Sequence, residues 1–342
     1  MMEQGQSSLT AYHLRLTLQA TEPLELEQQP GSALRGLLFQ GLWDRFCVNK
    51  AATECATCPL VQTCPVSALV APLRDEHPRG RDIPRPFVTC PPLAAAAAES
   101  GLRLEPGQSI TFGLTLLGSA GKLFPYVVMA AQVMEQNGLG RALQANGRRR
   151  GRFRIEQIEA VHPFTGATAP LFARGVAAVQ APELAITAAD VAARARDLPT
   201  DAWTLHFLTP TRITAQGHLV SRPDFQVLAL RLAERLEQVE LEYANLPNDS
   251  QAEGVERLGE IRYQQIKELA ASCRMLSNET RWVDIKSYSS RQRRLTPIGG
   301  FIGRATFAAP AAPVLRELLV WGEVLHVGKN TVKGDGWYQI ET

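Results

Sequence analysis

Three glycines and two lysines lie close together near the C-terminus, in a combination that suits the binding of phosphate. The segment 321–338 contains them in the order Gly328, Lys329, Lys333, Gly334 and Gly336. Glycine tolerates positive φ and has no Cβ, so a phosphate can approach its backbone N–H closely, and the lysines add positive charge. The spacing is not that of a Walker loop, because a helix pattern precedes the glycines and a short strand follows them. A glycine-rich turn before a terminal strand explains the same residues about as well.

Four cysteines form a second group with chemical potential, at spacings typical of metal ligands: Cys47, Cys55, Cys58 and Cys64. Two thiolates separated by two residues can hold one ion from a tight turn. A structural zinc site is the first interpretation, and an iron–sulfur cluster is the alternative. Four small buried hydrophobic side chains remain a third interpretation. Disulfides are not expected, because the sequence has no secretory signal and the cytosol is reducing.

Arginine is concentrated in two further places. One run surrounds Phe153 and includes Arg148, Arg149 and Arg150, which can hold RNA phosphates while the ring stacks a base. A solvated charge run is an equally good interpretation. A second basic cluster, which we expect to contact an RNA backbone, contains Lys286, Arg291, Arg293 and Arg294. Because the formal net charge is only +2, a nucleic-acid site has to come from such local clustering.

The elements that must position these residues follow one pattern twice. The order strand, helix, strand, strand, helix, strand is predicted for 12–161 and again for 203–340, which is the ferredoxin-like order. We therefore expect an α+β protein of tandem ferredoxin-like (RRM-like) domains with a cysteine-rich insertion after the first helix. The expected boundaries are 1–165 for the first domain, with the insertion at 47–64, then a linker at 166–199 and the second domain at 200–342. No apolar run is long enough to span a bilayer, so we expect a cytoplasmic protein with no membrane contact.

Several segments of the second domain resemble the RAMP proteins of CRISPR systems. They are Thr209–Ile213, Pro297–Phe307, Leu325–Lys329 and the residues Thr331, Gly334, Gly336 and Tyr338. The similarity is closest to the C-terminal domain of the CRISPR-associated endoribonuclease that processes precursor CRISPR RNA. It covers the last third of the chain strongly and the first half more loosely.

The resemblance implies cleavage of CRISPR repeat RNA without a catalytic metal, by attack of a ribose 2′-OH on the adjacent phosphate. The implied products carry a 2′,3′-cyclic phosphate and a 5′-OH, and the implied partners are the repeat RNA, the crRNA and other CRISPR effector subunits. Histidine suits the proton transfers, and we expect His326 first and His77 second in this role. Arg35 and Lys329 are the candidate cations.

The resemblance also leaves an alternative open. Relatives in this family often carry a catalytic histidine in or just after the first helix, and 33–46 contains none. A non-catalytic crRNA-binding subunit of a CRISPR effector complex would use the same glycines and basic clusters.

Overall fold

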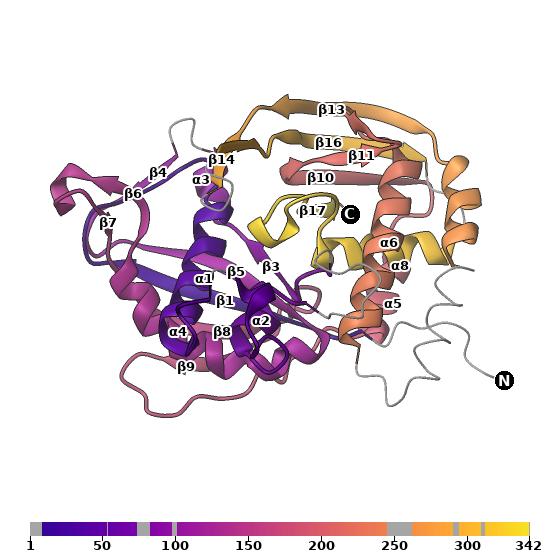
Figure 1. Cartoon of the computed structure of the whole chain (residues 1–342). Coiled ribbons are helices and arrows are strands. Elements are labelled where there is room, and N and C mark those ends of the chain that lie inside the picture. The colour runs from indigo at the N-terminus through magenta and orange to yellow at the C-terminus, as the bar shows by residue number, and fades with distance from the viewer. Residues whose placement is uncertain are drawn as a thin grey trace. The chain divides into compact units, whose positions relative to one another are not determined.

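The computed structural model describes residues 9–341 apart from 53, 74–82, 98–100, 245–261, 290–293 and 309–311. The chain divides into two compact units, Thr10–Ile186 and Thr187–Thr342, and Leu9 belongs to the second. Figure 1 shows the helices and strands of both units. No helix within the described ranges is both long and apolar enough to cross a membrane.

The N-terminal unit is built on a five-stranded antiparallel sheet with the order β3-β5-β1-β8-β9. Its strands are β1 (Ala11–Ala20), β3 (Phe87–Cys90), β5 (Ser109–Leu117), β8 (Phe153–Val161) and β9 (Thr168–Ala173). Its main helices are α1 (Gly31–Phe46) and α4 (Phe124–Asn137). Apart from β9, this is the ferredoxin-like arrangement that the sequence predicts.

The smaller elements of this unit lie between the main ones. They are β2 (Leu24–Leu26), the 3₁₀ turn η1 (Cys55–Thr57), α2 (Pro65–Val70), α3 (Leu93–Ala97), β4 (Leu102–Leu104), η3 (Gly118–Leu123), β6 (Leu139–Leu143), η4 (Gln144–Asn146) and β7 (Arg149–Gly151). β2 pairs with β4, and β6 pairs with β7.

Leucine alternation explains why β1 lies at the centre of this sheet. Leu14, Leu16 and Leu18 point to one face and are buried there, where α1 and α4 supply the apolar partners. The two helices pack closely, because a Cβ at Gly41 of α1 would lie 2.5 Å from Met134 Cγ of α4. The core of the unit is therefore the layer between the helix pair and the sheet.

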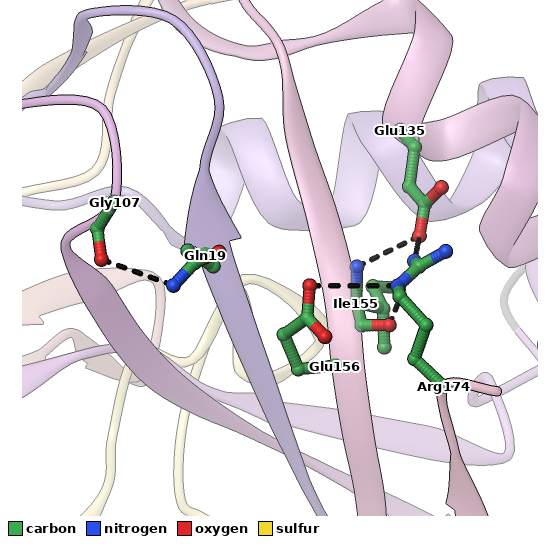
Figure 2. Close-up of polar contacts among 6 residues, drawn as sticks. All are labelled: Gln19, Gly107, Glu135, Ile155, Glu156 and Arg174. Atoms are coloured by element: carbon green, nitrogen blue, oxygen red, sulfur yellow. Dashed lines mark hydrogen bonds and ion pairs between the residues drawn. The ribbon is translucent and has the colours of Figure 1, made fainter.

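Beyond the end of β9, side chains take its place as hydrogen-bond partners of the β8 backbone (Figure 2). The pairing of β8 with β9 begins at Gln157, so the backbone of Ile155 is not bonded by β9. Instead, Ile155 N–H donates to Glu135 of α4 (2.7 Å), and Ile155 C=O accepts from Arg174 (2.8 Å). Arg174 also pairs with Glu135 and with Glu156, which ties the chain after β9 to α4 and β8.

The C-terminal unit has a four-stranded antiparallel sheet with the order β13-β16-β10-β17. Its strands are β10 (Ala202–Thr211), β13 (Met275–Val283), β16 (Gly300–Ala308) and β17 (Tyr338–Glu341). The helices are α5 (Ala188–Arg196), α6 (Phe225–Tyr243) and α8 (Pro313–Leu325), and residues 262–271 are also helical. Two hairpins complete the unit: β11 (Ile213–Ala215) with β12 (His218–Val220), and β14 (Lys286–Ser289) with β15 (Arg294–Pro297). The strand order is again ferredoxin-like, which confirms the predicted fold class.

The expected linker at 166–199 is the main difference from the prediction. Residues 168–173 form β9 of the N-terminal sheet, and 188–196 form α5, which packs on α8. The division between the units falls between Ile186 and Thr187. β9 contains Pro170 and buries only Leu171, a pattern that edge strands allow.

Candidate functional site

The three segments that resemble RAMP sequences meet at one end of the C-terminal sheet. Residues 326–337 form a loop, here called the glycine-rich loop, and it is bonded along its length to residues 208–212. Gly336 N–H donates to Pro210 C=O (3.0 Å), and Lys329 N–H donates to Arg212 C=O (2.9 Å). The Thr209 hydroxyl donates to Gly334 C=O (2.8 Å) and accepts from Trp337 N–H (2.9 Å). The segment Pro297–Phe307 is joined to the other two by Arg212, whose Nη1 donates to Gly299 C=O (3.0 Å).

Backbone contacts inside the protein use most of the N–H groups of the glycine-rich loop. Val327 N–H donates to Gly336 C=O (3.0 Å), Lys333 N–H to Asn330 C=O (2.7 Å) and Gly334 N–H to Thr331 C=O (2.9 Å). The expected cradle of free backbone donors is therefore not formed by these residues. Phosphate contacts at this loop have to come mainly from side chains.

Glycine is required in this loop by the protein's own packing. Gly328 and Gly336 have φ values of 82° and 72°, and Gly334 has a φ of 81°. A Cβ on Gly336 would lie 1.8 Å from Val327 O, and one on Gly328 would lie 2.5 Å from Arg212 O. Since carbonyl oxygens of the backbone cannot move aside cheaply, these glycines hold the loop against its neighbours.

His326 is fully buried at the start of the glycine-rich loop. Its ring stacks on Trp337 with centroids 5.8 Å apart and an interplanar angle of 6°. Its backbone has φ 59° and ψ 167°, directly after α8 ends. This position argues against the role in proton transfer that was expected for His326, because the ring has no exposed surface for an RNA.

Cationic side chains remain available at this end of the sheet. Lys329 is exposed, and Lys286 is exposed at the start of β14. The guanidinium of Arg212 lies over the ring of Trp282, 5.9 Å from its centroid, and both side chains are half-buried. Arg294 begins β15, and Arg291 and Arg293 lie outside the described residues.

In the N-terminal unit, Arg148, Arg149 and Arg150 are exposed at β7. Arg148 and Arg150 form no ion pair with any residue that the structure describes. Phe153, however, is 2% exposed, so the expected stacking of a base on this ring is wrong. The arginines can contact phosphate, but without an aromatic partner at this position.

Arg35 of α1 is half-buried and lies over the ring of Phe39, 5.8 Å from its centroid. Burial, and after it the charge of Arg85, lowers the pKa of Arg35 to about 10. The side chain still carries its charge at neutral pH, and a bound phosphate would relieve the repulsion between the two arginines. His77, the second histidine candidate, lies outside the described residues.

The four cysteines follow α1 as predicted, at its end, around η1 and before α2. All four are half-exposed free thiols. Burial, and after it the charges of Cys64, Cys47 and Cys58, raises the pKa of Cys55. In the ranges that the structure describes, no group of three or more His, Cys, Asp and Glu side chains is arranged to hold a metal ion. The donor set suits zinc, but these positions do not confirm the site.

A further cluster, not expected from the sequence, lies on the face of the C-terminal sheet that the helices leave uncovered. His206 of β10 lies opposite Arg304 of β16 and Gln339 of β17. Glu341 Oε1 lies 3.4 Å from His206 Nδ1 and 2.6 Å from Arg304 Nε. Burial, and after it the charge of Arg304, lowers the pKa of His206, while Glu341 opposes the change.

The family comparisons agree with the division into two units. Residues 9–184 match the AF_1859_N family, described as an N-terminal domain. Residues 205–338 match the family described as CRISPR-associated endoribonuclease Cas6. No curated protein matches the sequence.

Solved structures match over nearly the whole chain. Thermus thermophilus Cas6 has 15% identity and a TM-score of 0.50, covering 97% of this chain and 99% of that chain. A product complex of the same Cas6 has 17% identity and a TM-score of 0.53, with 97% and 100% covered. A partial Cas6-RT-Cas1–Cas2 complex has 14% identity and a TM-score of 0.53, covering 98% of this chain and 46% of that chain. At these identities the similarity shows the fold alone.

Proposed function

The chain is a CRISPR-associated RAMP protein with a C-terminal Cas6 endoribonuclease domain, and from this premise we propose that it cleaves CRISPR repeat RNA without a catalytic metal. The products are expected to carry a 2′,3′-cyclic phosphate on one side and a 5′-OH on the other. The known Cas6 structure with bound product supports the substrate class by analogy of fold.

One observation carries the proposal. The matched range 205–338 contains all three segments that meet at the glycine-rich loop. Their end of the sheet exposes Lys329 and Lys286 and carries a half-buried Arg212 over Trp282. A cationic surface beside an aromatic ring is a typical binding surface for single-stranded RNA.

The reaction needs three tasks to be performed. One group takes the proton of the 2′-OH, a proton source serves the leaving 5′-oxygen, and a cation stabilises the charge on the phosphorane-like transition state. Lys329, Lys286 and Arg212 suit phosphate neutralisation in the C-terminal unit. Arg35 and the exposed Arg148, Arg149 and Arg150 suit it in the N-terminal unit.

The test is incubation of the purified protein with a labelled RNA of its own CRISPR repeat in the presence of EDTA. We expect a single cut, a cyclic phosphate end, and no cleavage when the nucleotide 5′ of the cut is replaced by its 2′-deoxy form. Complete inhibition by EDTA, with recovery on addition of Mg²⁺, would contradict the metal-free mechanism. Cleavage of the 2′-deoxy RNA would contradict attack by the 2′-OH.

A second function is favoured by a specific observation. The described helix α1 contains no histidine, and the histidine beside the glycine-rich loop is buried. A non-catalytic subunit that binds crRNA in a CRISPR effector complex would have both features. In the same assay such a subunit would shift the RNA in a gel and leave it intact.

Partners beyond RNA are proposed at the level of class. The partial Cas6-RT-Cas1–Cas2 complex has Cas6 as one part of a larger assembly, and the match covers 46% of that chain. We expect this chain to pass its product to, or remain bound in, other CRISPR effector subunits. Copurification of tagged protein with crRNA and proteins encoded beside it tests this expectation.

A further inference from the structure

The structure limits which histidine can move a proton. Among the described histidines, His326 and His162 are buried. Burial, and after it the charge of Arg15, lowers the pKa of His13 to about 4, and Thr115 holds its Nδ1 at 2.8 Å. His218 is exposed on the short strand β12. Only His206 combines an accessible ring with a charged carboxylate partner and a cation in the part of the chain that the structure describes.

Three strands build the surroundings of His206, so its geometry is fixed by the sheet rather than by a loop. The side chains of His206, Glu341 and Arg304 are 30%, 39% and 49% exposed. Their strands are hydrogen-bonded neighbours in the order β16-β10-β17. A residue pair on the same face, Thr204 and Thr306, is joined through its hydroxyls at 2.9 Å, which adds a rigid support beside the cluster.

The contacts within the cluster use Nδ1 of His206 and Nε of Arg304, and they leave His206 Nε2 and the Arg304 Nη atoms for a substrate. Glu341 lies beside Nδ1, so a proton on Nδ1 leaves the lone pair on Nε2 as the acceptor. Arg304 contacts Glu341 through Nε, and its Nη atoms have no partner among the described residues. A base and a free pair of cationic donors therefore share one face of the sheet.

We propose that His206 is the general base of RNA cleavage, that Glu341 is its positioning residue, and that Arg304 is the cation for the reacting phosphate. This inference rests on the proposed endoribonuclease function. It assigns the reaction to the uncovered face of β10, β16 and β17. RNA held at the glycine-rich loop can reach this face, because the segment 208–212 continues directly from His206 along β10.

The step is balanced without a metal or a redox partner. His206 Nε2 takes the proton of the 2′-OH while the 2′-oxygen forms a bond to phosphorus. The P–O bond to the 5′-oxygen breaks, and the leaving oxygen keeps the electron pair and takes a proton from water. The imidazolium then returns its proton to the hydroxide so formed. Arg304 donates to the non-bridging oxygens as their charge increases.

The charged side chains around the cluster determine whether removal of His206 should change the cleavage rate or the affinity for RNA. On β13, Glu279 lies opposite Arg304, and Arg281 lies opposite Ile302. Glu279 and Glu341 therefore face Arg304 and Arg281, and the cluster is close to charge-neutral. Neutral surroundings contribute little affinity for a polyanion, so removal of His206 should affect the rate and spare binding.

The first experiment is single-turnover cleavage of the repeat RNA by His206→Ala, with His218→Ala as the control histidine. We expect a rate loss of roughly 10²–10⁴-fold for His206→Ala, with RNA affinity and thermal midpoint close to wild type. His218→Ala should cleave at the wild-type rate. His206→Gln, which keeps the side-chain volume better, replaces the alanine variant if that variant does not fold. Wild-type cleavage by a folded His206 variant overturns the assignment, whereas a wild-type protein that leaves the RNA uncut overturns the endoribonuclease function as well.

The second experiment is the pH profile of Glu341→Gln. The carboxylate favours the imidazolium and opposes the effects of burial and Arg304, so its removal should move the acidic limb of the rate profile to lower pH. A purely structural ion pair would lower the thermal midpoint and leave that limb in place. An unmoved limb in a slower but folded variant overturns the positioning role.

Discussion

The ring of His326 lies nearly parallel to the ring of Trp337, with 5.8 Å between the centroids and 6° between the planes. The two residues bracket the glycine-rich loop, and the histidine is fully buried there. The stack therefore packs the first and last residues of the loop against each other in the interior of the protein. A role in packing explains the position of His326 better than a role in catalysis.

His326→Ala tests this role. The variant leaves a cavity under the loop, and we expect the free energy of unfolding to fall by about 2–4 kcal/mol. Single-turnover cleavage below the new unfolding transition should stay within a few-fold of wild type. Urea unfolding and the cleavage assay are the two measurements. A loss of 10²-fold or more in rate at unchanged stability would restore His326 as a proton donor.

Alanine substitutions at two glycines with similar φ values distinguish the cost of a steric clash from the cost of conformational strain. Gly336 and Gly217 have φ values of 72° and 81°, but a Cβ on Gly217 would meet nothing within 4 Å. We expect Gly217→Ala to cost about 1 kcal/mol of unfolding free energy. Gly336→Ala should cost several kcal/mol, because Val327 O would lie 1.8 Å from the new atom. Equal costs in urea unfolding would show that the loop can relax around the clash.

Lys329 should contribute to RNA affinity through its charge alone. Its side chain is exposed and its backbone N–H is already bonded to Arg212. We expect Lys329→Ala to weaken RNA binding and to reduce the slope of log affinity against log salt by about 1. Lys122→Ala, at an exposed position of the N-terminal unit, is the matched control. A slope unchanged in both variants would remove the loop from the RNA-binding surface.

Glu323 of α8 should make stability depend on pH near neutrality. Burial raises its pKa to about 7, although its Oε1 accepts from Ile340 N–H at 2.8 Å and Arg194 acts in the opposite direction. The folded chain keeps a proton that the unfolded chain releases above a pKa of about 4.5. The resulting stability is complete below that pH and is lost as the pH rises through about 7.

Glu323→Gln removes this dependence and keeps the acceptor for Ile340. We expect the variant to be more stable than wild type at pH 8, by about 2–3 kcal/mol, and the two to converge at pH 4.5. Thermal or urea unfolding across that range measures the effect. Glu268→Gln, at an exposed position of the same unit, should leave the curve unchanged. If the unfolding free energy of the wild type does not change across this pH range, Glu323 is charged in the folded protein.

The cysteine segment can be tested by elemental analysis. We predict about one zinc per chain held by Cys47, Cys55, Cys58 and Cys64, and a less stable N-terminal unit once a chelator removes it. Iron with acid-labile sulfide and a brown colour would indicate a cluster instead. Metal-free protein with four titratable thiols and unchanged stability in chelator would contradict both predictions.

Much of the fold follows from local patterns, and the exceptions have a physical cause. Leu14, Leu16 and Leu18 alternate because one face of β1 is buried, and the same signal marks β5, β8 and β10. β13 (Met275–Val283) lacks such a signal at its start. The first residues of this edge strand are exposed on both faces, so no apolar period identifies them.

The candidate site was less predictable than the fold. The glycines and lysines of the loop were found, but the sequence does not show that Pro210, Arg212 and Gly336 bond to the loop's own backbone. His206, Glu341 and Arg304 come from strands far apart in the chain. Only the strand order and register bring them together, and these depend on pairing between distant segments. Once ferredoxin-like order is assumed, the outward positions of the first, third and last strands of the sheet (β10, β16 and β17) are the signal that could have found them.

The attachment of the glycine-rich loop to residues 208–212 has a consequence for entropy. A loop with glycines at positive φ would normally lose much freedom when a ligand orders it. Here the ordering takes place during folding, so RNA meets a surface already in its final shape. The amide protons of Lys329, Gly334 and Gly336 should accordingly exchange with solvent as slowly as those of a buried strand, before any RNA is added.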